Sequence, residues 1–130
     1  SVQVGYNAGL AHRIEAGSDF FLMPSRFEPC GLNQMYSLRY GSIPVAHAVG
    51  GLVDTIRDKP SKLGLANGIK FNHFKIEAFR AAISSAIGIY HDQEKLQNMI
   101  RAGMRDDYSW HKSAQIYGEI ARNAHSRQRI

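Results

Sequence analysis

The fold class follows from one segment of the chain, Phe20-Phe21-Leu22-Met23-Pro24-Ser25-Arg26-Phe27-Glu28-Pro29-Cys30-Gly31-Leu32-Asn33. Its first four residues form a short apolar run closed by Pro24, which is typical of a strand that helices bury on both faces. A polar loop follows, and a helical pattern then begins near Gly31, extends to Tyr40 and ends at Gly41. The order strand, loop, helix predicts one unit of a parallel α/β sheet.

The same alternation of strands and helices extends along the whole chain. Before the opening segment, Ala8–Ala16 is predicted to be a helix ended by Gly17, and Val2–Val4 is a weak strand candidate. After it, the predicted elements are a strand at Ile43–Ala46, a short helical turn around Val53–Arg57, a loop at Lys59–Asn67, a strand at Gly68–Phe71, and helices over Ile76–Tyr90, Gln93–Gly103 and from Ser109 onward. Strands that alternate with helices predict an α/β domain with a parallel sheet, which here ends in helices.

The helix predicted over Ile76–Tyr90 has a clear periodicity. Apolar side chains recur at offsets of three and four residues, at Ile76, Phe79, Ile83, Ile87 and Tyr90. Such spacing gives an amphipathic stripe, which is the pattern of a helix that faces a protein core.

The composition is that of an ordinary globular domain. The 130 residues suffice for about one domain, and 44% of them are hydrophobic and 21% charged. The sequence shows neither an apolar segment long enough to span a membrane nor a signal peptide. The single cysteine, Cys30, excludes an internal disulfide, does not form a zinc site by itself, and fits a reducing compartment. Because the chain begins at Ser1 without an initiator Met, we expect it to be part of a longer protein.

A net charge of +5 invites a nucleic-acid interpretation, but the distribution of charge argues against it. Residues 1–60 carry five basic and five acidic side chains, so this part of the chain is balanced. The excess lies in residues 61–130, where eleven basic and six acidic side chains are spread over predicted helix faces and the tail. Solvated helix faces explain this pattern better than a nucleic-acid surface. We therefore expect neither nucleic acid nor a membrane as a partner.

Two loops are predicted to lie at the carboxyl ends of the strands, where parallel α/β sheets bind ligands. They are Ser25–Cys30, after the first strand, and His47–Gly51, after the second. In the first loop, Glu28 supplies a carboxylate and Pro29 stiffens the turn. Gly31 then lets the backbone approach a ligand closely as the helix opens.

The helix that follows the first loop predicts an anion site. Its first backbone amides, around Gly31, Leu32 and Asn33, have no intrahelical partners. A carboxylate beside free amides suits a polyhydroxylated ligand that carries phosphate, such as a sugar nucleotide. The alternative is a surface ion pair between Glu28 and Arg26, and spacing alone does not separate the two interpretations.

The remaining candidates are weaker. Gly50-Gly51 either serves a tight turn or contacts a ligand in the neighbouring loop. Tyr6 is either a core or rim aromatic or a platform for a base. Cys30 has no histidine in a recognisable relation to it, so packing beside the ligand is favoured over nucleophilic catalysis. No metal site is predicted, since three histidines lack metal-ligand spacing and are interpreted as structural or surface residues: His12, His47 and His73.

Three motifs carry a specific resemblance to a known family: Ser25–Gln34, Tyr36–Pro44 and Gly50–Thr55. Tyr6, the stretch at residues 10–14 and the closing Tyr108-Ser109-Trp110 match the same family in order and spacing. On these motifs, which cover nearly the whole chain, the sequence resembles bacterial glycogen synthase and plant starch synthase, of glycosyltransferase family 5.

The resemblance implies a GT-B glycosyltransferase with two Rossmann-like domains. Residues 1–130 would form the later part of its C-terminal, nucleotide-sugar-binding domain. The N-terminal domain would be absent from this chain, and the helix beginning near Ser109 would pack on it. The implied reaction transfers glucose from ADP-glucose to the non-reducing end of an α-1,4-glucan, with retention and without a metal ion or other cofactor. The implied location is the bacterial cytoplasm, or the plastid in a plant.

The resemblance also implies roles for individual residues. Glu28, the implied catalytic residue, would hold the donor glucose or assist its departure. Tyr6 would stack on the adenine. The implied substrate-binding residues beside the glucose and diphosphate are Cys30, Gly31, Leu32, Asn33 and Gly51.

The chain departs from related retaining transferases at three positions. Tyr36 stands where many have a second glutamate, which favours ADP-glucose over UDP-glucose, and Asn33 and Val49 stand where many have threonine. We expect the fragment alone to lack synthase activity. We also expect it to be marginally stable or to self-associate, since half a Rossmann-like domain exposes a sheet edge. The alternative function is a non-catalytic nucleotide- or glucan-binding module.

Overall fold

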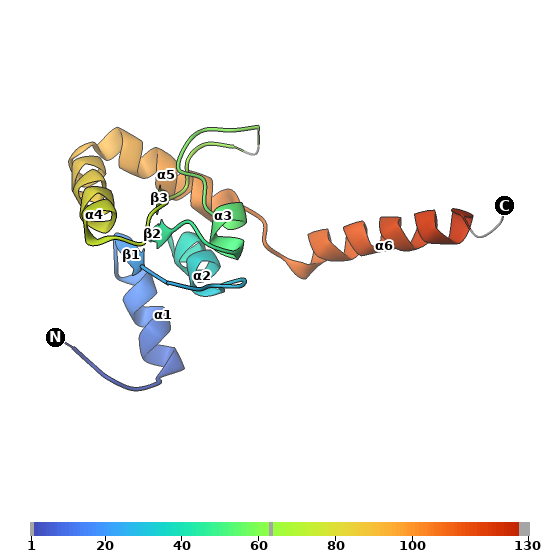
Figure 1. The fold of residues 1–130 in the computed structure, drawn as a ribbon, viewed down its shortest axis with the longest axis horizontal. Coiled ribbons are helices and arrows are strands. Elements are labelled where there is room, and N and C mark those ends of the chain that lie inside the picture. The colour runs from blue at the N-terminus through green and yellow to red at the C-terminus, as the bar shows by residue number, and fades with distance from the viewer. Residues whose placement is uncertain (1, 63, 128–130) are drawn as a thin grey trace.

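The computed structural model describes residues 2–62 and 64–127, which form a three-stranded parallel sheet with helices on both faces (Figure 1). In spatial order, the strands are β1 (Phe20–Met23), β2 (Ile43–His47) and β3 (Ile69–Phe71). The helices are α1 (Ala8–Ala16), α2 (Asn33–Tyr40), α3 (Gly51–Thr55), α4 (Ile76–His91), α5 (Gln93–Arg105) and α6 (Trp110–Arg127). The predicted α/β class, with a parallel sheet and closing helices, is confirmed.

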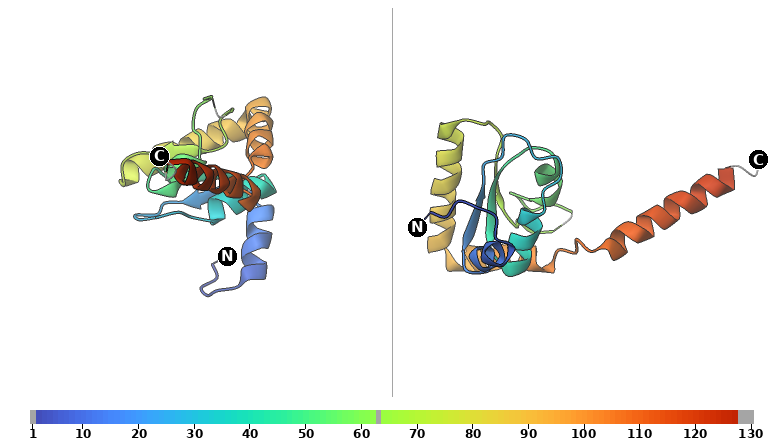
Figure 2. Two further views of the ribbon diagram at one scale, coloured as in Figure 1. Left: turned by 90° about the vertical axis from the view of Figure 1, so that its right-hand side faces the viewer. Right: turned by 90° about the horizontal axis from the view of Figure 1, so that it is seen from below.

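The sheet separates two layers of helices, which the views from the side and from below show most clearly (Figure 2). α4 covers one face, and α2 and α3 cover the other. α5 runs across the amino ends of the strands and contacts both α4 and α2. β1 aligns Phe20 with Ile43, and β2 aligns Val45 with Ile69, so the carboxyl ends of the strands lie at one edge.

β2 is the centre of the core, because every one of its residues is buried. Its side chains alternate between the two layers, as the pleat of a strand requires. Ile43 and Val45 belong to the apolar cluster beneath α4 and α5, whereas Ala46 belongs to a smaller cluster with Leu52 of α3.

The helix ends follow from the residues that cap them. α1 has the predicted bounds, and the Asn7 side chain accepts a hydrogen bond from the Leu10 amide at 2.9 Å. α2 ends as predicted at Gly41, whose φ of 85° is a left-handed conformation that glycine adopts without strain. It begins at Asn33 rather than near Gly31, because Leu32 forms its N-cap.

Two sequence predictions about burial are wrong. Val2–Val4 forms no strand, and its valines are 90% and 99% exposed. β1 is not buried on both faces, since Leu22 is 49% exposed.

Only part of the apolar stripe of α4 packs on the sheet, where the Phe79 ring lies 5.4 Å from the Phe71 ring of β3. The buried residues of α4 are Ala82, Ala86 and Ile89, whereas Ile87 is 56% and Ile76 82% exposed. Small alanines allow the helix to approach the sheet closely, and the larger side chains lie to one side. Ile83, Ile87 and Tyr90 border a hollow of about 280 Å³ along the edge of β1, which is also lined by Phe20, Leu22 and Ala86.

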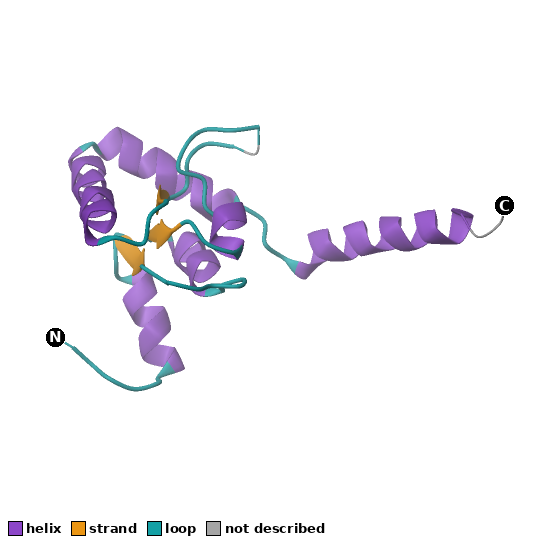
Figure 3. Ribbon diagram, in the orientation of Figure 1, coloured by secondary structure: helices purple, strands orange, loops and turns teal. Residues whose placement is uncertain are grey.

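α6 extends away from the rest of the described chain (Figures 1 and 3). It begins at Trp110, one residue after the predicted cap Ser109. Its apolar side chains are exposed, with Trp110 at 85%, Tyr117 at 70% and Ile120 at 58%. No helix among the described residues has both the length and the apolar character needed to cross a membrane.

Candidate functional site

The two loops singled out from the sequence lie in direct contact at the carboxyl edge of the sheet. The Gly51 amide donates to the Pro29 carbonyl at 3.2 Å. A Cβ on Gly50 would collide with the carbonyl oxygen of Glu28, and one on Gly51 with that of Cys30. Gly50 also has a φ of 50°, a left-handed conformation. The glycine pair therefore allows the backbones of the two loops to touch.

Within the described residues, none of the backbone amides of Cys30–Asn33 donates a hydrogen bond to the protein. They precede and open α2, and the dipole of that helix adds partial positive charge at the same place. Free amides at a helix N-terminus bind anions such as phosphate.

Glu28 is half-buried, precedes these amides by two residues in the same loop, and makes no ion pair with any described residue. The Arg26 guanidinium instead lies over the Phe74 ring, 5.7 Å from its centre. The surface pairing of Glu28 with Arg26 is therefore absent from this structure, and the carboxylate is available to a ligand.

Three further candidates from the sequence are exposed. Cys30 and Tyr6 lie on the surface, Tyr6 at 97% exposure, and Leu32 is 54% exposed. Tyr6 precedes α1 and makes no ring contact within the described chain. The structure thus brings Glu28, the Cys30–Asn33 amides and Gly51 together, and it leaves Tyr6 outside this cluster.

Gln34 is a part of the site that the sequence analysis missed. It is completely buried, and its Nε2 donates to the carbonyls of Cys30 at 3.2 Å and Gly31 at 3.0 Å. The same group donates to Thr55 Oγ1 at 3.3 Å. Gly31 has a φ of 76°, and a Cβ there would meet the Gln34 side chain. The only sequence signal was a glutamine at the start of a helix that follows a glycine, which predicts no particular partner.

His47 has a structural role, as expected. Its Nδ1 lies 2.9 Å from the Ser25 carbonyl, and because a carbonyl only accepts, Nδ1 carries the proton and donates. The ring contacts those of Phe71 and Phe74, at centroid distances of 5.4 and 5.3 Å. His47 thereby holds the start of the Ser25–Cys30 loop. Among the described residues, no group of His, Cys, Asp and Glu side chains is arranged to hold a metal ion.

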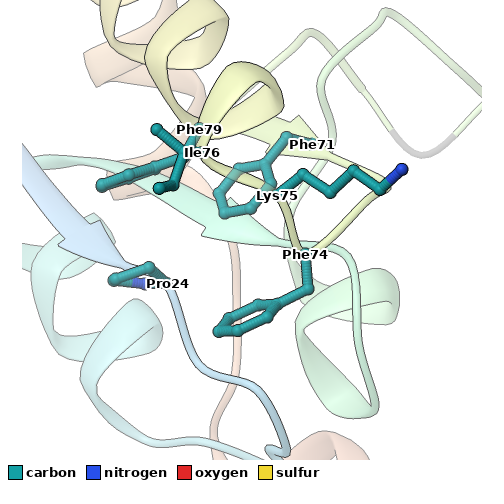
Figure 4. Close-up of a pocket in the computed structure, with 6 residues that line it drawn as sticks. All are labelled: Pro24, Phe71, Phe74, Lys75, Ile76 and Phe79. Atoms are coloured by element: carbon teal, nitrogen blue, oxygen red, sulfur yellow. The ribbon is translucent and has the colours of Figure 1, made fainter.

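An apolar hollow of about 150 Å³ lies beside this loop (Figure 4). Phe74 and Pro24 lie on one side of it, and the first turn of α4 on the other. Its lining offers hydrocarbon and aromatic surface, with Lys75 as the one charged member. The hollow therefore presents mainly apolar surface beside the loop, with the Lys75 ammonium as its one charged group among the lining residues.

Comparison with known proteins identifies glycogen synthases as relatives of this chain. No family model matches the chain. A glycogen synthase from Marinobacter nauticus is 52% identical over 124 residues, which are 95% of this chain and 25% of that protein. A glycogen synthase from Myxococcus xanthus is 52% identical over 117 residues, 89% of this chain and 24% of that protein. The chain therefore spans about a quarter of the length of the curated relatives it matches.

Solved structures agree with these relatives. The catalytic domain of starch synthase IV from Arabidopsis thaliana, bound to ADP and acarbose, matches 95% of this chain and 26% of its own, with a TM-score of 0.82 and 38% identity. A sucrose-phosphate synthase from Thermosynechococcus elongatus, 22% identical with a TM-score of 0.64 over 87% of this chain and 27% of its own, shares the fold. The chain belongs to the glycogen and starch synthase family, as a segment that corresponds to about a quarter of such an enzyme.

Proposed function

We propose that the chain forms part of the donor site of a retaining glucosyltransferase, which passes glucose from ADP-glucose to the non-reducing end of an α-1,4-glucan. The observation that carries the proposal is the segment Glu28–Asn33, hereafter the donor loop. Within the described chain, its Glu28 carboxylate makes no ion pair, and the backbone amides that follow at Cys30–Asn33 have no acceptor. Family membership supports the reaction, and the related starch synthase IV binds ADP and acarbose.

The donor loop supplies two kinds of interaction. The amides of Cys30–Asn33 bind the diphosphate, which gains negative charge as its bond to glucose breaks. Preorganised amides stabilise such charge without having to move. Glu28 accepts hydrogen bonds from the glucose and holds it during departure, Gly51 supports the loop from below, and Tyr6 stacks on the adenine. ADP-glucose is a substrate, and the proposal assigns neither a metal ion nor a cofactor.

The rest of the enzyme is proposed to cover the apolar surfaces that the described residues leave open. The exposed face of α6 is assigned to the N-terminal domain, and the hollow along β1 to the earlier part of the C-terminal domain. Residues 1–130 are then the later part of that domain. Because they hold only one side of the cleft, the isolated chain is expected to have no synthase activity, and the bacterial relatives favour a cytoplasmic location.

The test is glucose transfer to glycogen by the complete enzyme that contains these residues. Glu28→Gln keeps the shape of the side chain and removes its charge, so kcat should fall by about a hundredfold or more with ADP-glucose as donor. Glu94→Gln, at an exposed position on α5, is the matched control and should behave as wild type.

Three results would count against parts of the proposal. Wild-type kcat in Glu28→Gln would remove Glu28 from the chemistry. Transfer from UDP-glucose in preference to ADP-glucose would contradict the donor. Glucan or nucleotide binding without any transfer would favour a binding module instead of an enzyme.

A further inference from the structure

Thr55, the last residue of α3, joins two sets of hydrogen bonds. Its hydroxyl accepts from Gln34 Nε2 at 3.3 Å and donates to the Gly51 carbonyl at 2.8 Å. Its own carbonyl accepts from Asn67 Nδ2 at 3.2 Å and from the Tyr108 hydroxyl at 2.9 Å. Thr55 is therefore bonded on one side to the helix beneath the donor loop and on the other to the linker between α5 and α6.

Asp106, in that linker, accepts hydrogen bonds from three side chains of the network, those of Arg57, Asn67 and Tyr108. Arg57 Nη2 donates to both carboxylate oxygens, at 2.9 and 2.8 Å. Asn67 Nδ2 donates to Oδ2 at 2.7 Å, and the Tyr108 hydroxyl lies 3.2 Å from the same oxygen, so its one proton is shared between Asp106 and the Thr55 carbonyl. The Arg57 and Asp106 side chains are only 13% and 16% exposed. Burial and the Asp106 charge raise the pKa of Tyr108 to about 12, so its hydroxyl remains a donor across the physiological range.

Gln34 carries the network into the donor loop through the carbonyls of Cys30 and Gly31. In a trans peptide, the C=O and the N–H of the next residue point in opposite directions. Holding these two carbonyls inward therefore turns the N–H groups of Gly31 and Leu32 outward. Those are two of the amides assigned to the diphosphate.

We propose that Thr55 is a positioning residue for the donor loop: its hydroxyl fixes the Gln34 amide, and the Asp106 cluster fixes Thr55 from the α5–α6 linker. The inference deepens the proposed function, on which its link to the donor rests. The orientation of the Gln34 amide depends on the hydrogen bonds of Nε2 alone, because Oε1 has no partner among the described residues. Without the Thr55 hydroxyl, Nε2 loses one of its three acceptors, and only the loop carbonyls then orient the amide.

The test compares Thr55→Val with Thr55→Ser in the 130-residue chain. Valine keeps the branched shape and loses the hydroxyl, whereas serine keeps the hydroxyl and loses the methyl. The control is Ser85→Ala on α4, which removes a hydroxyl that bonds the carbonyl four residues earlier, as Thr55 does. The readouts are the amide NMR resonances of Gly31 and Leu32 without ligand, and the dissociation constant for ADP followed on the same resonances.

Thr55→Val should move the Gly31 and Leu32 resonances and weaken ADP binding about threefold to tenfold, the effect of one lost hydrogen bond. Thr55→Ser and Ser85→Ala should leave both readouts as in wild type. Equal effects of valine and serine, or unmoved loop resonances in the valine variant, would overturn the inference.

Two further outcomes keep this inference separate from the proposed function. If the wild-type loop does not respond to ADP, the donor assignment fails, while the ligand-free spectra still decide whether Thr55 positions the loop. If Thr55→Val does not fold, Tyr108→Phe removes a single hydroxyl at the far end of the network. That variant should move the same two resonances in the same direction by less, and unchanged resonances would overturn the coupling to the linker.

Discussion

The two faces of the sheet are built from different kinds of side chain. Beneath α4 and α5 the buried cluster consists of apolar side chains such as Val45, Phe71 and Ile89, and the His47 ring packs against it at the carboxyl end of β2. On the side of α2 and α3, Gln34 and Asn67 are completely buried as well. Burying a polar group costs free energy unless it is hydrogen-bonded, so this second side needs its network of bonds to form at all.

The two sides of the sheet therefore have different roles, one in stabilising the fold and the other in shaping the site. The α4 side holds the sheet together through contacts between apolar side chains. The α2 and α3 side uses buried amides, glycines and backbone contacts to shape the donor loop. Substitutions that exploit this contrast should therefore have opposite or unequal effects at matched positions on the two sides.

The largest effect is expected from a methyl group added to a glycine. Gly50→Ala forces an L-residue into a left-handed conformation and drives its Cβ into the Glu28 carbonyl. Strain and overpacking together should lower the free energy of unfolding by about 3–6 kcal/mol. Gly88→Ala on α4 adds the same atom where nothing lies within 4 Å, and should raise stability by roughly 0.5–1 kcal/mol. Urea unfolding of both variants checks the pair, and a tolerated Gly50→Ala would contradict the contact between the loops.

The next largest effect is expected from two isoleucine substitutions that show which side of α4 packs on the sheet. Ile89 is 7% exposed and Ile87 56% exposed, although the two lie only two positions apart. Ile89→Ala should cost about 2–4 kcal/mol, because it leaves a cavity in the core. Ile87→Ala should cost less than about 1 kcal/mol. Equal losses of unfolding free energy in the two variants, measured by thermal or urea unfolding, would show that Ile87 in the apolar stripe packs as tightly as Ile89.

The smallest effect on stability is expected at Glu15, a buried residue of α1. Glu15 is 3% exposed, and burial raises its pKa above the ordinary value of 4.5, opposed by His12 at 3.6 Å. The folded state therefore keeps the proton to a higher pH than the unfolded state does. The stability from this group is present below pH 4.5 and is lost as the pH rises through the folded-state pKa.

The Glu15→Gln variant has no carboxyl group at this position to lose a proton. Its free energy of unfolding should therefore change less than that of wild type as the pH rises from 4.5 to neutrality. Unfolding free energies measured across this range check the result, with His12 present in both proteins. Glu77→Gln, at an exposed position on α4, is the control. Parallel pH profiles for wild type and Glu15→Gln would show that the buried carboxyl does not control the dependence.

Local patterns predicted the fold well. The run Phe20–Met23 before a proline and the stop at Gly41 are decided by neighbouring residues, and both were placed correctly. The sequence also indicated that the loops after β1 and β2 lie at one edge, because parallel strands share that geometry. Periodicity was right only in part on α4, where Phe79 packs against the core and Ile87 is exposed, since it shows which residues share a side of a helix but not how that side meets the sheet.

The polar network behind the donor loop was beyond sequence reasoning. Gln34 and Thr55 are 21 positions apart, and Tyr108 is 53 positions beyond Thr55. Each is an ordinary polar residue on a helix or linker, and only the folded chain brings them together. A buried glutamine has the same sequence pattern as an exposed one, so its role depends on tertiary packing.

The most direct test of the central claim is an ADP titration of the wild-type chain, followed through its backbone amide resonances. The free amides of the donor loop should bind the diphosphate, whereas residues 82–89 lie inside α4, where backbone amides are paired along the helix. We therefore predict that the resonances of Gly31, Leu32 and Asn33 move on titration and that those of residues 82–89 do not. Movement confined to α4, or no movement in the donor loop, would contradict the assignment of this loop as a donor site.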